Sequence, residues 1–168
     1  VGHVLELKQS TIRNVSWVGF DDLGPAFLGL IKRKAAIAEG DAFNVDAVHE
    51  TEGMVLNRLH DMSFGFATIK TTVDAHPEKR AVDIKVEVDT GPSCRFGSIE
   101  IVGDHNIPEQ FIRSEVTIKQ GSAFRAAALA ETQRRLFALG VFSMVNVVPD
   151  LSNPDGKVIP IRLDLSSS

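Results

Sequence analysis

The residues that could bind a metal or transfer a proton are five histidines, one cysteine and a few neighbouring acidic residues. None of the histidines has another histidine or Cys94 at the spacing of a ligand pair. His60 and Asp61 would point apart on a helix, and the pair Asp21-Asp22 lacks a third ligand. A single cysteine allows no disulfide within the chain. We therefore predict no enzyme activity, no catalytic residue, no metal and no cofactor.

Sequence features for binding phosphate groups are also weak. Neither G-x-G-x-x-G nor G-x-x-x-x-G-K occurs, so the common phosphate loops are absent. The net charge of −4 argues against nucleic acid as the main partner. The runs Lys32-Arg33-Lys34 and Arg134-Arg135 are more typical of solvated helix faces. The first run is nevertheless the best local candidate for contact with anionic headgroups or an acidic partner.

A repeated pair of strands is the most informative pattern in the chain. Residues 140–165 contain two alternating segments joined by the turn Asn153-Pro154-Asp155-Gly156, and residues 65–88 contain the same arrangement around His76-Pro77-Glu78-Lys79. The apolar positions of the later strand of each pair are Val82, Ile84, Val86 and Val88, and Ile159, Ile161, Leu163 and Leu165. Two copies at matching positions predict a tandem repeat.

The other elements of the repeat also align. Residues 12–19 match 96–103 without gaps, and both segments alternate and end in glycine. Helices are predicted at 25–38 and 108–119, the latter capped by Asn106, and a second helix follows each, with Asn44 as the first copy's cap. Each unit thus reads β-α-α-β-β. We assign residues 11–91 and 92–168 to the units, with Thr90, Gly91 and Pro92 as linker, and residues 1–10 to the last strand of a preceding unit or an N-terminal extension.

Several phrases carry a resemblance to a known family. A strand ends at Gly103, a helix is followed by Gly121-Ser122-Ala123-Phe124, and a strand is entered through Gly140, Phe142, Val145 and Val147. These features resemble the POTRA (polypeptide-transport-associated) module. Residues 89–97 are similar to the junction between POTRA units in the BamA/TamA family, and Gly65-Phe66-Ala67 is similar to its Gly-aromatic-Ala phrase. Members carry a periplasmic POTRA string ahead of an outer-membrane β-barrel.

The resemblance implies an α+β fold of two tandem units. Each would be a three-stranded mixed sheet of order 1-3-2, with both helices on one face and strand 2 at an edge. The implied function is a non-enzymatic docking module on the periplasmic face of the bacterial outer membrane, without a cofactor. Its partners would be unfolded outer-membrane proteins, accessory assembly proteins and the C-terminal membrane β-barrel of the same parent chain, but no nucleic acid. The alternatives are a POTRA pair of a two-partner secretion translocator, or a periplasmic protein-protein scaffold.

An edge strand offers unpaired backbone groups to which an extended client can add a strand. The hypothesis therefore places partner binding on both second strands, unless these edges are idle or covered by a neighbouring unit. The predicted residues are Ala67, Thr68, Ile69, Lys70, Thr71 and Val73 in the first unit, and Phe142, Met144, Val145, Asn146, Val147 and Val148 in the second.

The register of the second unit is ambiguous by one residue. Aligning glycines pairs Gly65 with Gly140, whereas aligning apolar residues pairs Ile69 with Val145, and one step turns every side chain to the other face. We predict that Val145 and Val147 face the helices, and that Met144 and Val148 lie on the open face. Pro160 should precede full pairing of its strand, because a central strand usually excludes proline.

Overall fold

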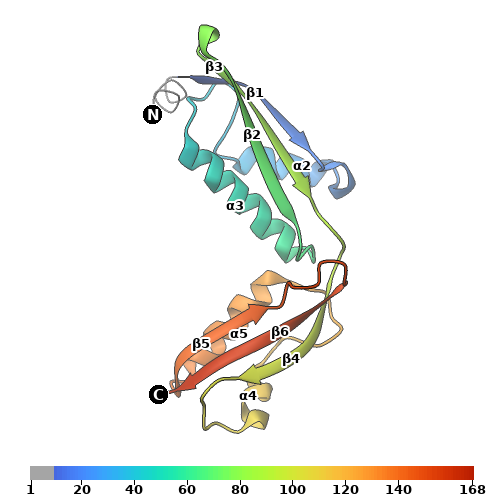
Figure 1. Ribbon diagram of the computed structural model, residues 1–168, viewed down its shortest axis with the longest axis vertical. Coiled ribbons are helices and arrows are strands. Elements are labelled where there is room, and N and C mark those ends of the chain that lie inside the picture. The colour runs from blue at the N-terminus through green and yellow to red at the C-terminus, as the bar shows by residue number, and fades with distance from the viewer. Residues whose placement is uncertain (1–9) are drawn as a thin grey trace. The chain divides into compact units, whose positions relative to one another are not determined.

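Residues 10–168 are described by a computed structural model (Figure 1). Apart from Ser10, the segment assigned above to a preceding unit lies outside the described residues. The chain forms two compact units, one comprising the chain through Arg58 with Ala67–Thr90, and the other Leu59–Phe66 with Gly91–Ser168. No helix among the described residues has the length and apolar character needed to cross a membrane.

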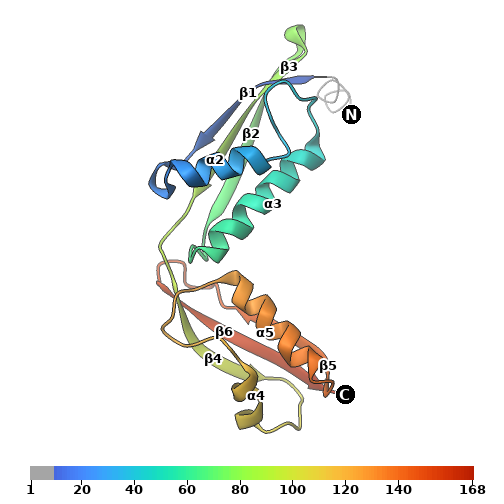
Figure 2. The same ribbon diagram turned by 180° about the vertical axis from the view of Figure 1, so that it is seen from behind.

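The first sheet has the predicted topology. It contains β1 (Thr11–Val18), β2 (Thr68–His76) and β3 (Ala81–Asp89) in the order β1-β3-β2, with β1 parallel and β2 antiparallel to β3. Helices α2 (Pro25–Lys34) and α3 (Val45–Asp61) connect β1 to β2 and supply the crossover that parallel strands need. Both helices lie on one face of the sheet (Figures 1 and 2).

The second sheet repeats this arrangement. It contains β4 (Arg95–Val102), β5 (Phe142–Pro149) and β6 (Val158–Ser167) in the order β4-β6-β5, with β4 parallel and β5 antiparallel to β6. Helices α4 (Glu109–Glu115) and α5 (Ala126–Ala138) again cover one face (Figure 2). The predicted α+β fold and strand order are therefore confirmed in both units.

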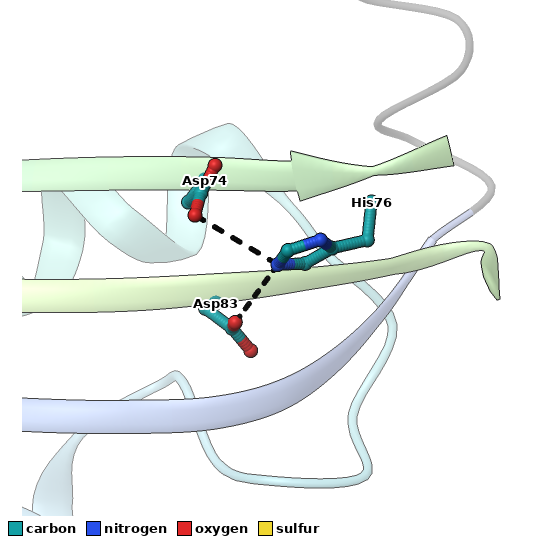
Figure 3. A group of neighbouring side chains, drawn as sticks. All are labelled: Asp74, His76 and Asp83. Carbon is teal, nitrogen blue, oxygen red and sulfur yellow. Dashed lines mark hydrogen bonds and ion pairs between the residues drawn. The ribbon is translucent and has the colours of Figure 1, made fainter. Parts of the chain in front are cut away.

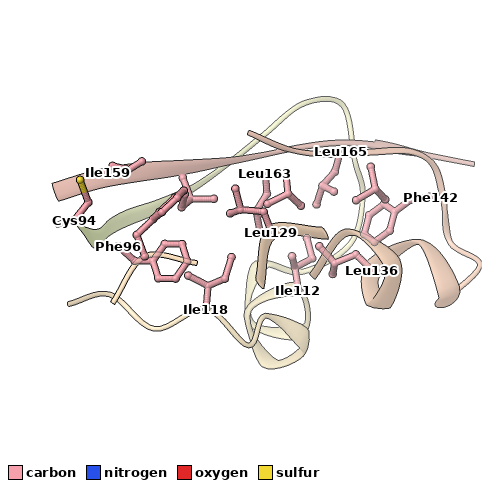
Figure 4. Close-up of a cluster of buried hydrophobic side chains, with 14 residues drawn as sticks. Cys94, Phe96, Ile112, Ile118, Leu129, Leu136, Phe142, Ile159, Leu163 and Leu165 are labelled. Atoms are coloured by element: carbon pink, nitrogen blue, oxygen red, sulfur yellow. The ribbon is translucent and has the colours of Figure 1, made fainter. Parts of the chain in front are cut away.

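Alternation along the central strands builds the two cores. In β6 the side chains of Ile159, Ile161, Leu163 and Leu165 are buried in the core of the second unit. Figure 4 labels three of them, Ile159, Leu163 and Leu165. The four valine and isoleucine positions of β3 are buried likewise. Leu136 of α5 and Ile112 of α4 are fully buried in the same cluster as the β6 residues. Removing such side chains from water contributes about 1.5–3 kcal/mol each to folding.

Glycine is required where β1 and β4 end. Gly19 and Gly103 have φ of +91° and +106°, a region that other residues rarely adopt. A Cβ atom would also press directly against the carbonyl oxygen of Val88 or Leu165 in the central strand. The predicted strand exits are confirmed, and both reasons apply at each one.

The helix ends differ in part from the prediction. Asn44 caps α3 through its side-chain oxygen, which accepts the amide hydrogens of Asp46 and Ala47. The expected extents 25–38 and 108–119 are too long, because Ala35 and Val116 already have extended ψ angles. Asn106 does not cap α4; it exchanges hydrogen bonds with Ser167 of β6 instead.

A β-bulge explains the one-residue ambiguity of the second hairpin. Phe142 pairs with Ser167 and Met144 with Ser166, so Ser143 is an extra residue of β5. Its hydroxyl donates to the carbonyl oxygens of Ser166 and Ser167. With this insertion Val145 and Val147 face the helices at 6% and 9% exposure, whereas Met144 and Val148 are 37% and 36% exposed. The predicted orientation of all four side chains is confirmed.

The expectation for Pro160 is wrong on one side of its strand. β6 begins at Val158, and β4 already pairs with Val158 and Ile159. Towards β5 the first paired residue is Ile161, opposite Pro149, and the carbonyl of Pro160 accepts from the amide of Asp150. The missing N–H of Pro160 therefore lies just beyond the β5 ladder, where its absence costs little.

Candidate functional site

The two second strands lie at sheet edges, as predicted. The residues assigned to docking lie within β2 and β5, except Ala67, which is buried and precedes β2 by one residue. Thr90, Gly91 and Pro92 lie between β3 and β4, and the division into compact units falls between Thr90 and Gly91. Gly91 has a φ of +62°, which favours glycine at this position.

The hydrogen bonds around β5 show which of its backbone groups face outward. The amide of Asp150 donates to Pro160 of β6, and in an antiparallel pair such groups point inward and outward on alternate residues. Met144, Asn146 and Val148 therefore point their N–H and C=O groups to β6, whereas Val145 and Val147 point theirs to the free edge. Pro149 shares the outward orientation but has no N–H. Beyond the bulge the edge thus has two outward N–H groups, and that of Val147 donates to Gln133 Oε1 of α5 at 3.2 Å.

An apolar groove lies beside this edge, between α5 and β5. It has a volume of about 420 Å³ and is lined by Gln133, Arg134 and Phe137 of the helix and by Ser143, Met144 and Val145 of the strand. Phe137 is 58% exposed, which is unusual for so large an apolar side chain. An exposed aromatic next to an unpaired strand edge is suited to contact with the side chains of an added strand.

The edge of β2 is polar by comparison. Thr68, Lys70 and Thr72 are exposed on its open face, and Thr71 on the helix side donates its hydroxyl to Glu52 of α3 at 2.8 Å. Glu52 also contacts His49 at 3.2 Å. A strand docked on β2 would meet charged and hydroxyl groups where one on β5 would meet Phe137 and Met144.

A cluster of ionisable groups on the open face of the first sheet was missed by the sequence analysis. Asp74 and His76 of β2 and Asp83 of β3 bring their ligand atoms within 4.8 Å of one another (Figure 3). The imidazole Nε2 of His76 lies 3.0 Å from Asp83 and 3.8 Å from Asp74. Asp74 and Asp83 are direct cross-strand partners. The sequence could have indicated this cluster, because residues two positions apart on a strand, such as Asp74 and His76, point to the same face.

Arg13 of β1 occupies the place that a cation would take in this cluster. Its Nη2 lies 2.6 Å from Asp83 Oδ2 and 3.3 Å from His76 Nε2, and its Nε donates to Asp83 Oδ1 at 3.0 Å. Bidentate pairs between arginine and a carboxylate are among the stronger hydrogen-bonded ion pairs, and this pair engages both carboxylate oxygens of Asp83. The cluster is thus an ion-pair network joining all three strands, with its positive charge supplied by the protein.

The network lowers the pKa of one group. Hydrogen bonds from Arg13 lower the pKa of Asp83 to about 2, and bonds from His76 and Asn14 act in the same direction. The same Arg13–Asp83 hydrogen bond raises the pKa of Arg13. The ionised carboxylate is therefore the form that the folded first unit favours.

The remaining candidates do not converge. Cys94 is buried in the core of the second unit, and Asp21 and Asp22 lie in a short 3₁₀ turn. The last turn of α2 contains the basic residues Lys32, Arg33 and Lys34. Positive charge at this end stabilises a helix through its interaction with the helix dipole.

Comparison with known proteins identifies the repeat. A sequence model of the POTRA family, described as a surface antigen variable number repeat, matches residues 10–91 and again residues 94–166. The outer membrane protein assembly factor BamA of Neorickettsia risticii (strain Illinois) is 25% identical over 134 residues, which are 79% of this chain and 18% of that protein. BamA of Neisseria meningitidis serogroup B is 29% identical over 108 residues, 61% of this chain and 13% of that protein. The chain thus spans less than a fifth of these relatives.

Solved structures show the same fold. The crystal structure of Haemophilus influenzae BamA POTRA3-5 superposes with a TM-score of 0.80 at 18% identity, over 94% of this chain and 61% of that one. BamA from Haemophilus ducreyi lacking POTRA domains 1-3 gives a TM-score of 0.74 at 16% identity, over 95% of this chain and 29% of that one. The family match covers both repeats, and the chain therefore belongs to the POTRA family, with two tandem domains similar to those of BamA.

Proposed function

We propose that this chain is a non-enzymatic, periplasmic module of an outer-membrane assembly factor, and that it binds extended segments of unfolded outer-membrane proteins by adding a strand to β5. Relatives named as outer membrane protein assembly factors support the setting. In that setting the module would lie at the periplasmic face of the outer membrane, next to accessory assembly proteins and the membrane β-barrel of its parent chain.

The observation that carries the proposal is that outward-facing backbone donors and an apolar groove lie together at one edge. Val145 and Val147 turn their backbone groups outward, and Phe137 and Met144 are exposed alongside. Backbone hydrogen bonds depend little on the sequence of the added strand, so this mode of binding suits a module that has many clients. Unfolded barrel strands are about ten residues long and alternate in polarity, so they can pair by backbone and place one apolar face against the groove.

β2 is the weaker of the two proposed docking edges. It has the same position in its sheet, but its flanking groups are Glu52, Lys70 and the network around Asp83. Charged side chains on an edge strand are a common means of discouraging strand addition. A strand docked there would also displace water from these charged groups, which costs free energy.

Proline substitution tests the proposal because it removes one backbone donor. Val147→Pro deletes an outward N–H and leaves the bonds from β5 to β6 in place, and Thr71→Pro is the matched change on β2. We expect Val147→Pro to reduce photo-crosslinking to a urea-denatured outer-membrane protein severalfold, and Thr71→Pro to reduce it little. Circular dichroism and thermal unfolding verify that both variants are folded.

Two results would contradict the proposal. Wild-type crosslinking by a folded Val147→Pro variant would exclude β5 as the docking edge. Binding of folded periplasmic proteins without any binding of unfolded ones would favour the scaffold alternative.

A further inference from the structure

We infer that Gln133 competes with the incoming strand for the β5 edge, and that a strand displaces it by placing a large apolar side chain in the adjoining groove. This inference rests on the proposed function, because it concerns what controls docking at the same edge.

The first step is the contact itself. The side-chain oxygen Oε1 of Gln133 accepts the amide hydrogen of Val147 at 3.2 Å. The N–H of Val147 points outward from β5, so an added strand needs this same hydrogen. The side chain of glutamine ends in an amide, so its carbonyl oxygen is chemically equivalent to the carbonyl oxygen of a peptide bond. Gln133 thus takes the place of one residue of a docked strand and satisfies the centre of the edge while it is free.

The matching position of the first unit supplies an independent comparison. Thr51-Glu52 of α3 corresponds to Thr132-Gln133 of α5, since both threonines are buried and a fully buried residue follows four positions later, Val55 or Leu136. Glu52 also reaches the strand residue that corresponds to Val147, which is Thr71, but it accepts from the hydroxyl and not from the backbone. The helix therefore reaches the edge in both units, and only Gln133 covers a backbone donor.

The groove explains how a client could win this competition. On an added strand, the residue directly opposite Val145 points to the same face as Val145, which is the helix side. That face leads into the groove beside Phe137, and Gln133 lines the groove as well. If Gln133 moves away from Val147, the N–H of Val147 becomes available to the added strand, and the shape of the groove that Gln133 lines changes as well. A large apolar side chain at this one position would gain burial that compensates for the lost contact.

Hydrogen exchange tests the contact between Gln133 and the amide of Val147 in the absence of a client. We expect Gln133→Ala to accelerate amide exchange of Val147 by roughly two- to tenfold, the range of one net hydrogen bond. Glu52→Ala is the matched control and should leave exchange of the Thr71 amide unchanged, because Glu52 contacts the hydroxyl. Unchanged exchange at Val147 would overturn the inference.

A peptide titration with the full 168-residue chain tests the competition. The probe is a synthetic peptide of about ten residues that alternates threonine and valine, with phenylalanine at one central valine position. Gln133→Ala should tighten binding roughly two- to tenfold, whereas Glu131→Ala, on the same helix but outside the groove, should not change it. Replacing the peptide phenylalanine by serine should weaken binding to the wild type, and Phe137→Ser should abolish that difference.

The outcomes separate the inference from the proposed function. Faster exchange at Val147 with tighter binding supports both. Faster exchange with unchanged binding would overturn the competition but leave docking on β5 intact. Failure of every variant to bind the peptide, while Val147 exchange rises, would overturn the proposed function and the competition together.

Discussion

Both sheets have an irregularity at the matching position of their parallel strand pair, but the residue found there differs between the two units. In β1 the extra residue is Arg13, between Ile12 and Asn14, and its guanidinium binds Asp83 of β3 on both carboxylate oxygens. In β4 the irregularity lies between Phe96 and Ile99, where Gly97 presents no side chain. The central strand has Pro160 where the first unit has Asp83, by the register of both ladders.

The difference extends to the second strands. The first unit adds Asp74 and His76 of β2 to the ion-pair network, so charged groups join its three strands on the open face. The second unit has a small pocket of about 210 Å³ there, lined by residues that include Ser98, Asp150 and Pro160. The shared fold therefore depends on the helix side of each sheet, and the open face and the edges are free to differ between repeats.

The largest expected effect tests the glycine of the second bulge. A Cβ atom at position 97 would lie 2.8 Å from Val158 Cγ1, 3.0 Å from the nitrogen of Pro160 and 3.2 Å from the carbonyl carbon of Ile159. Gly97→Ala should therefore lower the free energy of unfolding of the second unit by about 1–3 kcal/mol, as overpacking does. Urea denaturation measures this loss. Arg13→Ala in the first bulge is the matched control and should cost less, and an equal loss would break the distinction between the bulges.

An intermediate effect is expected from acid. The pKa of Asp83 is lowered to about 2 in the folded state, so its contribution to stability is present above its unfolded pKa, near 4. As pH falls from about 4 to about 2, the carboxylate takes up a proton and this contribution is lost. Asp83→Asn should remove that part of the acid sensitivity. Urea denaturation at about pH 5 and about pH 2.5 measures it, and an unchanged pH dependence would contradict the role of the network.

The smallest expected effect concerns metal ions. In the wild type the guanidinium of Arg13 satisfies Asp83 and lies next to His76, so added zinc should not bind this cluster. Arg13→Ala removes that charge and leaves two carboxylates and an imidazole, which are zinc ligands. We expect calorimetry to detect weak zinc binding by Arg13→Ala, and its absence in Arg13→Ala/His76→Ala. Zinc binding by the wild type at this cluster would show that Arg13 does not act as its cation.

Much of the fold could be predicted from local pattern. Alternation in β3 and β6, the glycines that follow β1 and β4, and the cap at Asn44 depend on neighbours close in sequence, and a repeated pattern reduces the ambiguity of each copy. The edge position of β2 and β5 followed from the resemblance of these elements to POTRA modules. The predicted helix ends were less accurate because Ala35 and Val116 leave the helix without a glycine or proline.

The sequence by itself determined the repeat and the alternation that buries one face of β3 and β6, and the resemblance to POTRA modules supplied the strand order. The tertiary structure alone decided the contacts that distinguish the two edges. Arg13 reaches Asp83 across 70 positions, and Gln133 reaches Val147 from a helix to a strand. Such contacts depend on the register of elements distant in sequence, and on the single extra residue Ser143, whose effect on register becomes definite only when β5 pairs with β6.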